Sequence, residues 1–487
     1  MINRIPKPIF LFASFVVLLA LYWPSLNGVP VWDDLSYLFK YDVITKDFSY
    51  LTIWQDFSWP MSVSIQKILF SWWGQNYTYY HCFNLLVHFL NAYLLLRLSD
   101  FFKFSFSRIL FLLFLLHPSN VISVSWMIQL KTLLCFLFAI ISFLCLTRAQ
   151  ENKKWYFPSW LCFLLSLLSK SASLPLCVIF FFFSYKKEHK KELLWLIPFF
   201  LFSLFAGLRI MESHVTKRAL GHLEATQIKP IAAETSSKIQ EKVVVKVAVK
   251  DVIPVVKNVL PPKPAVVKKN KMILKLENII LTAHYYFWQT LMPLENQPVK
   301  GLNYSRPGLI EYFHLIFLTL MIAINWATVA NLYLICGYIM MLPFLGIFPA
   351  PYMNLAWVSD QHLYLALPFF LCLWLTLLSK WQMKFSGLVP LIFLPLFAYQ
   401  IRTSALYYQN EVSFYKASLE ADALNVPIAY NLAVSYIQQG DINEALNVTN
   451  TMVHMADVVP EVRRNRYFSY IYFLDNDLQN MFNKKQK

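Results

Sequence analysis

Two adjacent carboxylates, Asp33 and Asp34, are the residues of this chain best placed for acid–base chemistry. They follow an apolar run at 9–26 and begin an aromatic-rich segment that extends to residue 80. Because a carboxylate is unstable inside hydrocarbon and stable at its edge, we expect the pair at a membrane face. A carboxylate near its reference pKa is ionised at neutral pH and accepts protons. The alternative is an ordinary interfacial loop.

Other polar residues in apolar surroundings are less specific. Lys170 follows the apolar run 156–169, where a lysine commonly extends its ammonium group to the membrane surface. His81 and His88 share one helix face, and packing or an interfacial hydrogen bond explains them better than metal ligation. No His, Cys and carboxylate set has zinc-site spacing, and the ten glycines form no phosphate-binding loop.

The composition predicts a membrane protein. The chain is 57% hydrophobic and only 14% charged, whereas soluble domains carry about a quarter charged residues. All seven cysteines lie in apolar segments, so no disulfide framework is visible. We expect about eleven spans, some of them tilted or partly buried in protein, with the first retained as a helix rather than cleaved as a signal. The runs lie near 9–26, 82–98, 108–128, 131–147, 156–169, 172–185, 192–211, 308–325, 329–347, 361–378 and 386–404.

Lysine and arginine residues in the short loops set the expected orientation. With the N-terminus in the cytoplasm, the cytoplasmic loops are the basic ones, near 103–108, 148–154, 186–191 and 380–384. The acidic pair and, after an odd number of spans, the C-terminus then lie outside. We expect the inner (cytoplasmic) membrane of a bacterium, or the endoplasmic reticulum membrane if the source is eukaryotic.

Four parts are expected along the chain. They are a transmembrane module (1–211) with its first extracytoplasmic loop at 27–80, an insertion (212–272), an interfacial helix with further spans (273–404) and a helical C-terminal domain (405–487). The insertion has twelve Lys/Arg and five Asp/Glu, and its Val–Lys alternation and prolines are typical of an extended tether or exposed edge strand. It suits anionic lipid, acidic glycan or a partner protein, and the alternative is a solvated insertion.

Residues 426–456 follow the spacing of a tetratricopeptide repeat, in which two antiparallel helices approach through small residues. The matching positions include Tyr430, Asn431 and Tyr436 in the first helix, and Gly440 and Asp441 in the turn. Because about three repeats are needed for an independent stack, we expect these helices to lean on the membrane domain or on another protein. Their expected role is to bind an acceptor or partner protein.

The order of elements, over nearly the whole chain, resembles the GT-C superfamily of membrane glycosyltransferases. It is most similar to the transmembrane-and-tetratricopeptide O-mannosyltransferase family. The similar segments are WDD (32–34), HCFNLLVHFLNAYLLL (81–96), HPSNVISVSWMIQLKTLL (117–134), LSKSASLPLCVIF (168–180) and SDQHLYLALP (359–368). The resemblance implies an all-α polytopic membrane fold, GT-C-like, that ends in a short tetratricopeptide-like repeat.

The resemblance also implies an activity and a site. Such enzymes transfer a sugar, with inversion, from a polyprenyl phosphate to an extracytoplasmic acceptor such as a protein Ser or Thr. The general base would be Asp33 or Asp34, and the donor phosphate would be bound by Lys170, Lys131, His117 and His362. The lipid-phosphate sugar is the one donor implied. A divalent metal occurs at the acidic pair in some relatives, and no nucleic acid is expected.

Several charged positions of that family are changed here. Trp59 and Gln361 stand where an arginine is usual, Ile122 replaces an acid, and Leu130 and Thr132 replace an arginine and an acid. Each loss of an arginine removes a bidentate phosphate ligand. Two hypotheses follow: a transferase, favoured by the acidic pair, or a catalytically inactive GT-C-like scaffold that recruits partners through its helical repeats and basic insertion. A transporter is disfavoured, since paired discontinuous spans are absent from the sequence.

Overall fold

The computed structural model describes residues 5–34, 50–186, 190–209, 271–294, 296–300, 310–313, 316, 328–347, 353, 356–380, 389–465 and 467–486. These residues are helical and contain no strand, although an isolated antiparallel bridge joins Lys300 and Val358. The predicted all-α class is therefore confirmed for the described part. The predicted basic insertion, up to residue 270, and most of the predicted span at 308–325 lie outside it.

Among the described residues, three helices are long and apolar enough to cross a membrane: α1 (Lys7–Leu26), α5 (Tyr77–Phe101) and α8 (Leu130–Ala149) with the turn before it. A fourth span results if α6 (Ser107–Leu115) and the segment Pro118–Ser125, which meet at a bend of 51°, are taken as one. Such helices are compatible with a membrane protein, but the expectation of about eleven spans is not met in the described part of the chain.

The difference has a geometric cause. In the part of the chain that the structure describes, four further apolar helices are only 10–17 residues long. A helix of that length extends about 15–26 Å, less than the hydrocarbon core of about 30 Å. The apolar runs of the sequence continue through turns that end the helices early. After α15 (Val329–Met341), for example, the run passes into a 3₁₀ turn at Leu342–Phe344 that contains a proline.

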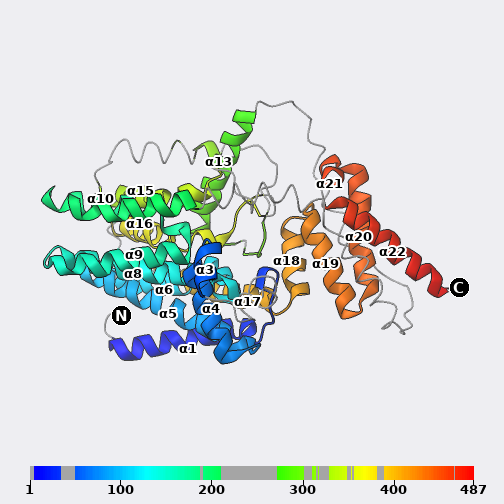
Figure 1. The fold of residues 1–487 in the computed structure, drawn as a ribbon, viewed down its shortest axis with the longest axis horizontal. Coiled ribbons are helices and arrows are strands. Elements are labelled where there is room, and N and C mark those ends of the chain that lie inside the picture. Colours follow the sequence, from blue (N-terminus) through cyan, green and yellow to red (C-terminus); the bar gives the residue numbers. More distant parts are fainter. Residues whose placement is uncertain are drawn as a thin grey trace.

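The helices of the first 405 residues form a bundle at one end of the molecule. In Figure 1, α5, α6, α8, α9, α10, α15 and α16 lie side by side there, with α13 standing across the end of the bundle. The predicted interfacial helix at 273–294 corresponds to α13. The remaining bounds in this part are α3 (Tyr50–Asp56), α4 (Pro60–Trp73), α9 (Tyr156–Ser169), α10 (Leu176–Lys186), α13 (Lys271–Gln289), α16 (Leu367–Lys380) and α17 (Val389–Ala405).

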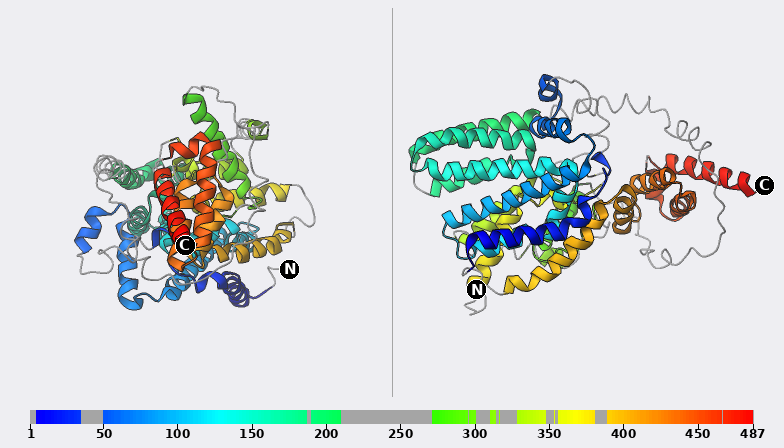
Figure 2. Two further views of the ribbon diagram at one scale, coloured as in Figure 1. Left: turned by 90° about the vertical axis from the view of Figure 1, so that its right-hand side faces the viewer. Right: turned by 90° about the horizontal axis from the view of Figure 1, so that it is seen from below.

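Five helices form the C-terminal part, which extends from the bundle along the long axis of the molecule (Figures 1 and 2). They are α18 (Glu411–Ala421), α19 (Val426–Gln439), α20 (Ile442–Val458), α21 (Pro460–Arg464) and α22 (Phe468–Gln486). Gly440, at φ 85°, ends α19 in the left-handed conformation that glycine favours, and the Asp441 side chain then caps α20. The assignment of these helices to the tetratricopeptide family stays a prediction.

The bundle shares an apolar core with α18 and part of α19, while the C-terminal helices also have two apolar clusters of their own. Leu18 of α1, Tyr408 after α17 and Phe414 of α18 are buried in the same cluster. Arg402 of α17 donates a hydrogen bond to the carbonyl of Ala20, at 3.0 Å. Helix α1 is therefore packed against α17 and the chain that follows α17.

Candidate functional site

Asp34 closes a tight turn after α1. Its carboxylate accepts hydrogen bonds from the backbone N–H groups of Val31, at 3.1 Å, and Ile128, at 2.8 Å, and its side chain is fully buried. Burial raises the pKa of Asp34 to about 8, while the two N–H groups work in the opposite direction. Since both oxygens are used to tie the first loop to the turn before α8, Asp34 has a structural role.

Asp33 is the more accessible member of the acidic pair. It is half-buried, and the charge of Lys131 acts on it. Burial raises the pKa of Asp33, and the nearby ammonium group partly opposes that rise. A carboxylate with a raised pKa is a stronger base. Of the two predicted bases, the geometry favours Asp33.

Trp32 fixes the backbone that presents Asp33. Its φ of 47° lies in the left-handed region that residues with a side chain rarely adopt. Its ring stacks on Trp126, with centroids 5.6 Å apart at 13°, and meets the edge of Phe414 at 5.6 Å. This aromatic packing, from the turn before α8 and from α18, stabilises the unusual conformation beside the carboxylate.

The chain after α17 also shapes the acidic turn, that is, residues 28–34 with the pair Asp33 and Asp34. The Val29 N–H donates to the carbonyl of Gln409 at 3.0 Å. A β-carbon placed on Gly28 would lie 2.3 Å from the carbonyl oxygen of Tyr408, so that only glycine allows this approach. The acidic turn therefore forms between α1, the start of α8 and the start of the C-terminal helices.

Polar side chains of α5 hold the irregular chain that precedes α8. The Asn84 amide donates to the carbonyl groups of residues 124, 126 and 127, at 3.3–3.4 Å. His88 is hydrogen-bonded to the hydroxyl of Tyr364, at 2.7 Å, and to the carbonyl of Leu115, at 3.1 Å. These bonds satisfy backbone groups that a bent helix leaves unpaired, and they thereby fix the start of α8.

Lys131 lies in the first turn of α8. Its ammonium group lies over the ring of Trp59, 4.6 Å from the centroid, a cation–π contact. The aromatic ring of Trp59 thus helps to hold the ammonium group of Lys131, whose charge also acts on Asp33.

Lys170 is positioned by the close approach of α8 and α9. Ser142 and Ser159 bond reciprocally to each other's backbone carbonyl groups, at 2.7 and 2.8 Å, and small residues of this kind let two helices pack tightly. Lys170 follows the last residue of α9, and its ammonium group donates to the Thr132 hydroxyl at 2.7 Å. Because Thr132 is next to Lys131 in the chain, the two lysines lie close together.

The two lysines create a positive environment. Burial, reinforced by the charge of Lys131, lowers the pKa of Lys170 to about 7. Burial and the charges of both lysines hold the pKa of His362 well below its ordinary value, so the imidazole is neutral at physiological pH. A bound anion would relieve this repulsion and stabilise the ammonium form of each lysine.

The two predicted histidines differ in their surroundings. The His362 ring is buried and stacks on Phe344, with centroids 4.1 Å apart, within the field of the two lysines. His117 uses both ring nitrogens in the fold: Nε2 lies 3.3 Å from the carbonyl of Thr290, and Nδ1 accepts from the Ser119 N–H. His117 therefore stabilises the bend after α6 and has no free nitrogen for a phosphate.

The predicted acceptor residues lie on α19, among the C-terminal helices (Figure 1). Tyr430, Asn431 and Tyr436 are half-buried, and the ring of Tyr430 packs against Tyr470 at 6.0 Å. They are not brought to the acidic turn. No group of three or more His, Cys, Asp or Glu side chains suited to a metal occurs in the described residues, so the acidic pair has no third ligand there.

Sequence reasoning missed a buried ion pair. Lys300 and Asp360, each about 5% exposed, are joined at 3.0 Å. Asp360 also accepts hydrogen bonds from the hydroxyl of Tyr285, at 2.6 Å, and from the amide of Gln289, at 3.1 Å. Asp360 therefore has a buried cationic partner in Lys300. The partner comes from a loop 60 residues away, and no spacing in a single sequence points to it.

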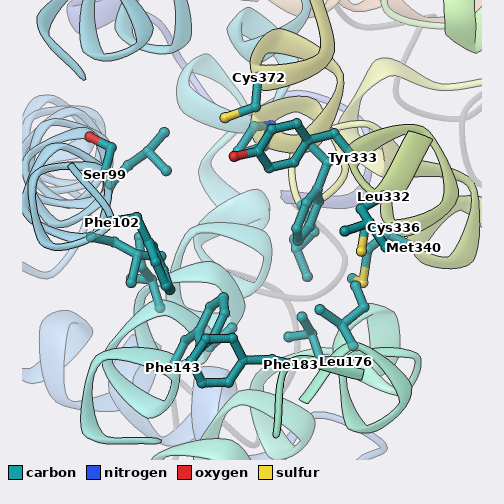
Figure 3. Close-up of a pocket in the computed structure, with 18 of the residues that line it drawn as sticks. Ser99, Phe102, Phe143, Leu176, Phe183, Leu332, Tyr333, Cys336, Met340 and Cys372 are labelled. Atoms are coloured by element: carbon teal, nitrogen blue, oxygen red, sulfur yellow. The ribbon is translucent and has the colours of Figure 1, made fainter. Parts of the chain in front are cut away.

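An apolar cavity of about 410 Å³ lies in the bundle between α5, α6, α8, α10, α15 and α16 (Figure 3). Phe136, which lines it, is five residues after Lys131, or about 7.5 Å along α8. Leu365, three residues after His362, also lines it. We call Lys131, Lys170 and His362 the positive cluster. The cavity therefore begins one to two helical turns away from this cluster and continues toward the opposite end of the bundle.

Comparisons with protein-family models, curated proteins and solved structures found no match to the chain. The similarity to GT-C enzymes stays a prediction from the sequence.

Proposed function

We propose that this chain is a membrane-bound glycosyltransferase that takes a sugar from a polyprenyl phosphate and transfers it, with inversion, to an extracytoplasmic acceptor, in the manner of O-mannosyltransferases. The observation that supports this most directly is the pairing of a half-buried carboxylate with the positive cluster, whose two lysines, Lys131 and Lys170, are half-buried. Lys131 interacts electrostatically with Asp33 on one side and with Lys170 and His362 on the other. A base and an anion site next to each other are what this reaction needs.

In the proposed reaction, the Asp33 carboxylate removes the proton from the acceptor hydroxyl. The hydroxyl oxygen forms a bond to the anomeric carbon, and the bond from that carbon to the phosphate oxygen breaks. The lipid phosphate leaves with the electron pair, opposite the attacking oxygen. Its negative charge is stabilised by the ammonium groups of Lys131 and Lys170, and His362 is placed to donate a hydrogen bond.

The acceptor would be a protein Ser or Thr. The C-terminal helices start at the acidic turn, where Tyr415 of α18 interacts electrostatically with Asp33 and Asp34. We propose that they belong to the tetratricopeptide class and present the acceptor, with Tyr430, Asn431 and Tyr436 on the binding side. The orientation proposed is N-terminus in the cytoplasm and acidic turn outside. The basic insertion would then meet anionic lipid or glycan on the outer side.

The alternative, a catalytically inactive scaffold, is supported by a specific contact. Lys131 is held over Trp59, so part of its donor capacity faces an aromatic ring rather than a ligand. His117, expected near the phosphate, is committed to the fold. In that case the C-terminal helices would recruit a partner while the acidic turn served only as their docking point.

Sugar transfer by the purified chain in lipid nanodiscs tests the proposal. Labelled polyprenyl-phosphate sugars are the donors, and an extract of the host's secreted proteins supplies acceptors. We expect Asp33→Asn to abolish transfer while the protein stays folded, because the amide keeps the shape but cannot accept the proton. Asp477→Asn, an exposed aspartate on α22, is the matched control.

A second variant separates donor binding from proton transfer. Lys170→Met should weaken donor binding, raising the KM for the lipid donor more than it lowers kcat, whereas Asp33→Asn should lower kcat. Transfer that continues in Asp33→Asn would contradict the assignment of the base. A folded wild-type chain that transfers no sugar but captures a stable partner would support the scaffold instead.

A further inference from the structure

The apolar cavity is closed toward the acidic turn. Phe114 and Phe136 stack there, with centroids 5.3 Å apart at 21°, and Tyr364 packs against the edge of Phe136 at 5.4 Å. All three side chains are buried, and the Tyr364 hydroxyl is engaged by His88. This aromatic layer separates the cavity from the positive cluster around Lys131.

The same cavity is open at the other end of the bundle. Phe102 at the end of α5, Phe182 of α10 and Val329 at the start of α15 all line it, and they are 43%, 45% and 56% exposed. Phe143 of α8, shown near Phe102 and Phe183 in Figure 3, lies twelve residues beyond Lys131, about 18 Å along the helix. A long apolar ligand would enter here, on the face opposite the acidic turn.

A cation lies at this opening. Lys103 is exposed and stands between Phe102 and Phe104, which both line the cavity. Its φ of 54° belongs to a tight turn that ends α5, in which the Phe104 N–H donates to the carbonyl of Ser99 at 2.9 Å. Lys103 forms no ion pair with any residue that the structure describes. The turn therefore places an exposed positive charge at the entrance of the apolar cavity.

We propose that this cavity binds one hydrocarbon chain of an anionic glycerophospholipid, whose phosphate-bearing headgroup lies at Lys103. The lining is almost wholly apolar, as a hydrocarbon chain requires, and Figure 3 shows Phe102, Phe143 and Phe183 on one side and Tyr333 and Met340 on the other. Because the opening and the cation are at the end away from Asp33, this lipid comes from the leaflet opposite the proposed donor. The inference stands independently of the proposed transferase activity.

Native mass spectrometry of the purified full chain tests the site, with phosphatidylglycerol and phosphatidylcholine of identical chains as probes. We expect one phosphatidylglycerol to be retained in preference to phosphatidylcholine by about fivefold, the factor that one lysine near an anionic surface supplies. Lys103→Glu should remove the preference. Lys154→Glu, a second exposed lysine outside the cavity, should keep it.

A second pair of variants tests the cavity itself. Cys372 points into it in Figure 3, so Cys372→Trp should fill the space and abolish retention of either lipid. Cys162→Trp, at a half-exposed cysteine of α9 that does not line the cavity, should have no effect. In the wild-type chain, phosphatidylglycerol with a photoreactive group at the chain end should label α8 and α15. Labelling confined to α1 or α4, or equal retention of the two lipids, would overturn the proposal.

Discussion

Mutation of Asp34 should lower the stability of the fold, whereas mutation of Asp33 should lower the activity. Asp34→Ala removes the acceptor of two buried backbone N–H groups, those of Val31 and Ile128. Asp33→Ala removes a half-buried carboxylate that interacts with Lys131 through charge alone. We therefore expect Asp34→Ala to unfold easily, and Asp33→Ala to stay as stable as the wild type while losing activity.

The size of the difference follows from the hydrogen bonds. Leaving a buried N–H group without an acceptor costs about 1–3 kcal/mol, so the two groups together predict a loss of about 2–6 kcal/mol for Asp34→Ala. A charge pair that is partly exposed contributes about 0–1 kcal/mol, which sets the expected loss for Asp33→Ala. The second variant should therefore fall within about 1 kcal/mol of the wild type.

Thermal unfolding in nanodiscs, followed by intrinsic tryptophan fluorescence, measures this contrast. Asp34→Ala should melt well below the wild type, whereas Asp33→Ala should melt close to it. Asp477→Ala provides the baseline for removal of an exposed aspartate. If both acidic-turn variants lost equal stability, or if Asp34→Ala melted with the wild type, the division of roles between the pair would be refuted.

Three further outcomes are expected. Phe414→Ala should accelerate hydrogen exchange at the amides of residues 28–34, because it removes the ring edge that supports Trp32, and Phe414→Tyr should restore protection; unchanged exchange would contradict the coupling. The pKa of Asp34, about 8, lies above its ordinary value of 3.8, so its contribution to stability is present below about pH 4 and is lost as the pH rises toward 8. Asp34→Asn, which does not titrate, should therefore show a flatter melting profile over this range, and parallel profiles would contradict the burial argument. Lys300→Met should destabilise the fold by about 3–5 kcal/mol by leaving Asp360 buried and unpaired, and the double variant with Asp360→Leu should recover much of that loss in urea unfolding.

Much of the architecture follows from local patterns. The apolar runs around residues 9–26, 82–98 and 131–147 correspond to α1, α5 and α8, since each holds an uninterrupted helical length of apolar side chains. The turn between α19 and α20 was visible from Gly440 and Asp441, a left-handed terminus followed by a capping residue. Within the described residues fewer helices than the expected eleven spans are long enough to cross a membrane, because hydropathy does not show where a helix ends inside an apolar run.

The site was predictable only in part. The acidic pair and Lys170 could be predicted as site residues, because each is a charge at the end of an apolar run. The different roles of Asp33 and Asp34 could not be predicted, because they depend on the N–H group of Ile128, in another part of the chain. The contact of Lys131 with Trp59 and the ion pair of Lys300 with Asp360 likewise depend on the fold.

The close approach of Gly28 to the carbonyl of Tyr408 bears on how the chain matures during translation. The acidic turn is synthesised well before Tyr408 and Phe414, which pack against it. Arg402 of α17 donates a hydrogen bond to Ala20 over a separation of 382 residues, so this contact also forms only after α17 has been synthesised. A nascent chain therefore completes the surroundings of Asp33 only after α17 and α18 have been synthesised.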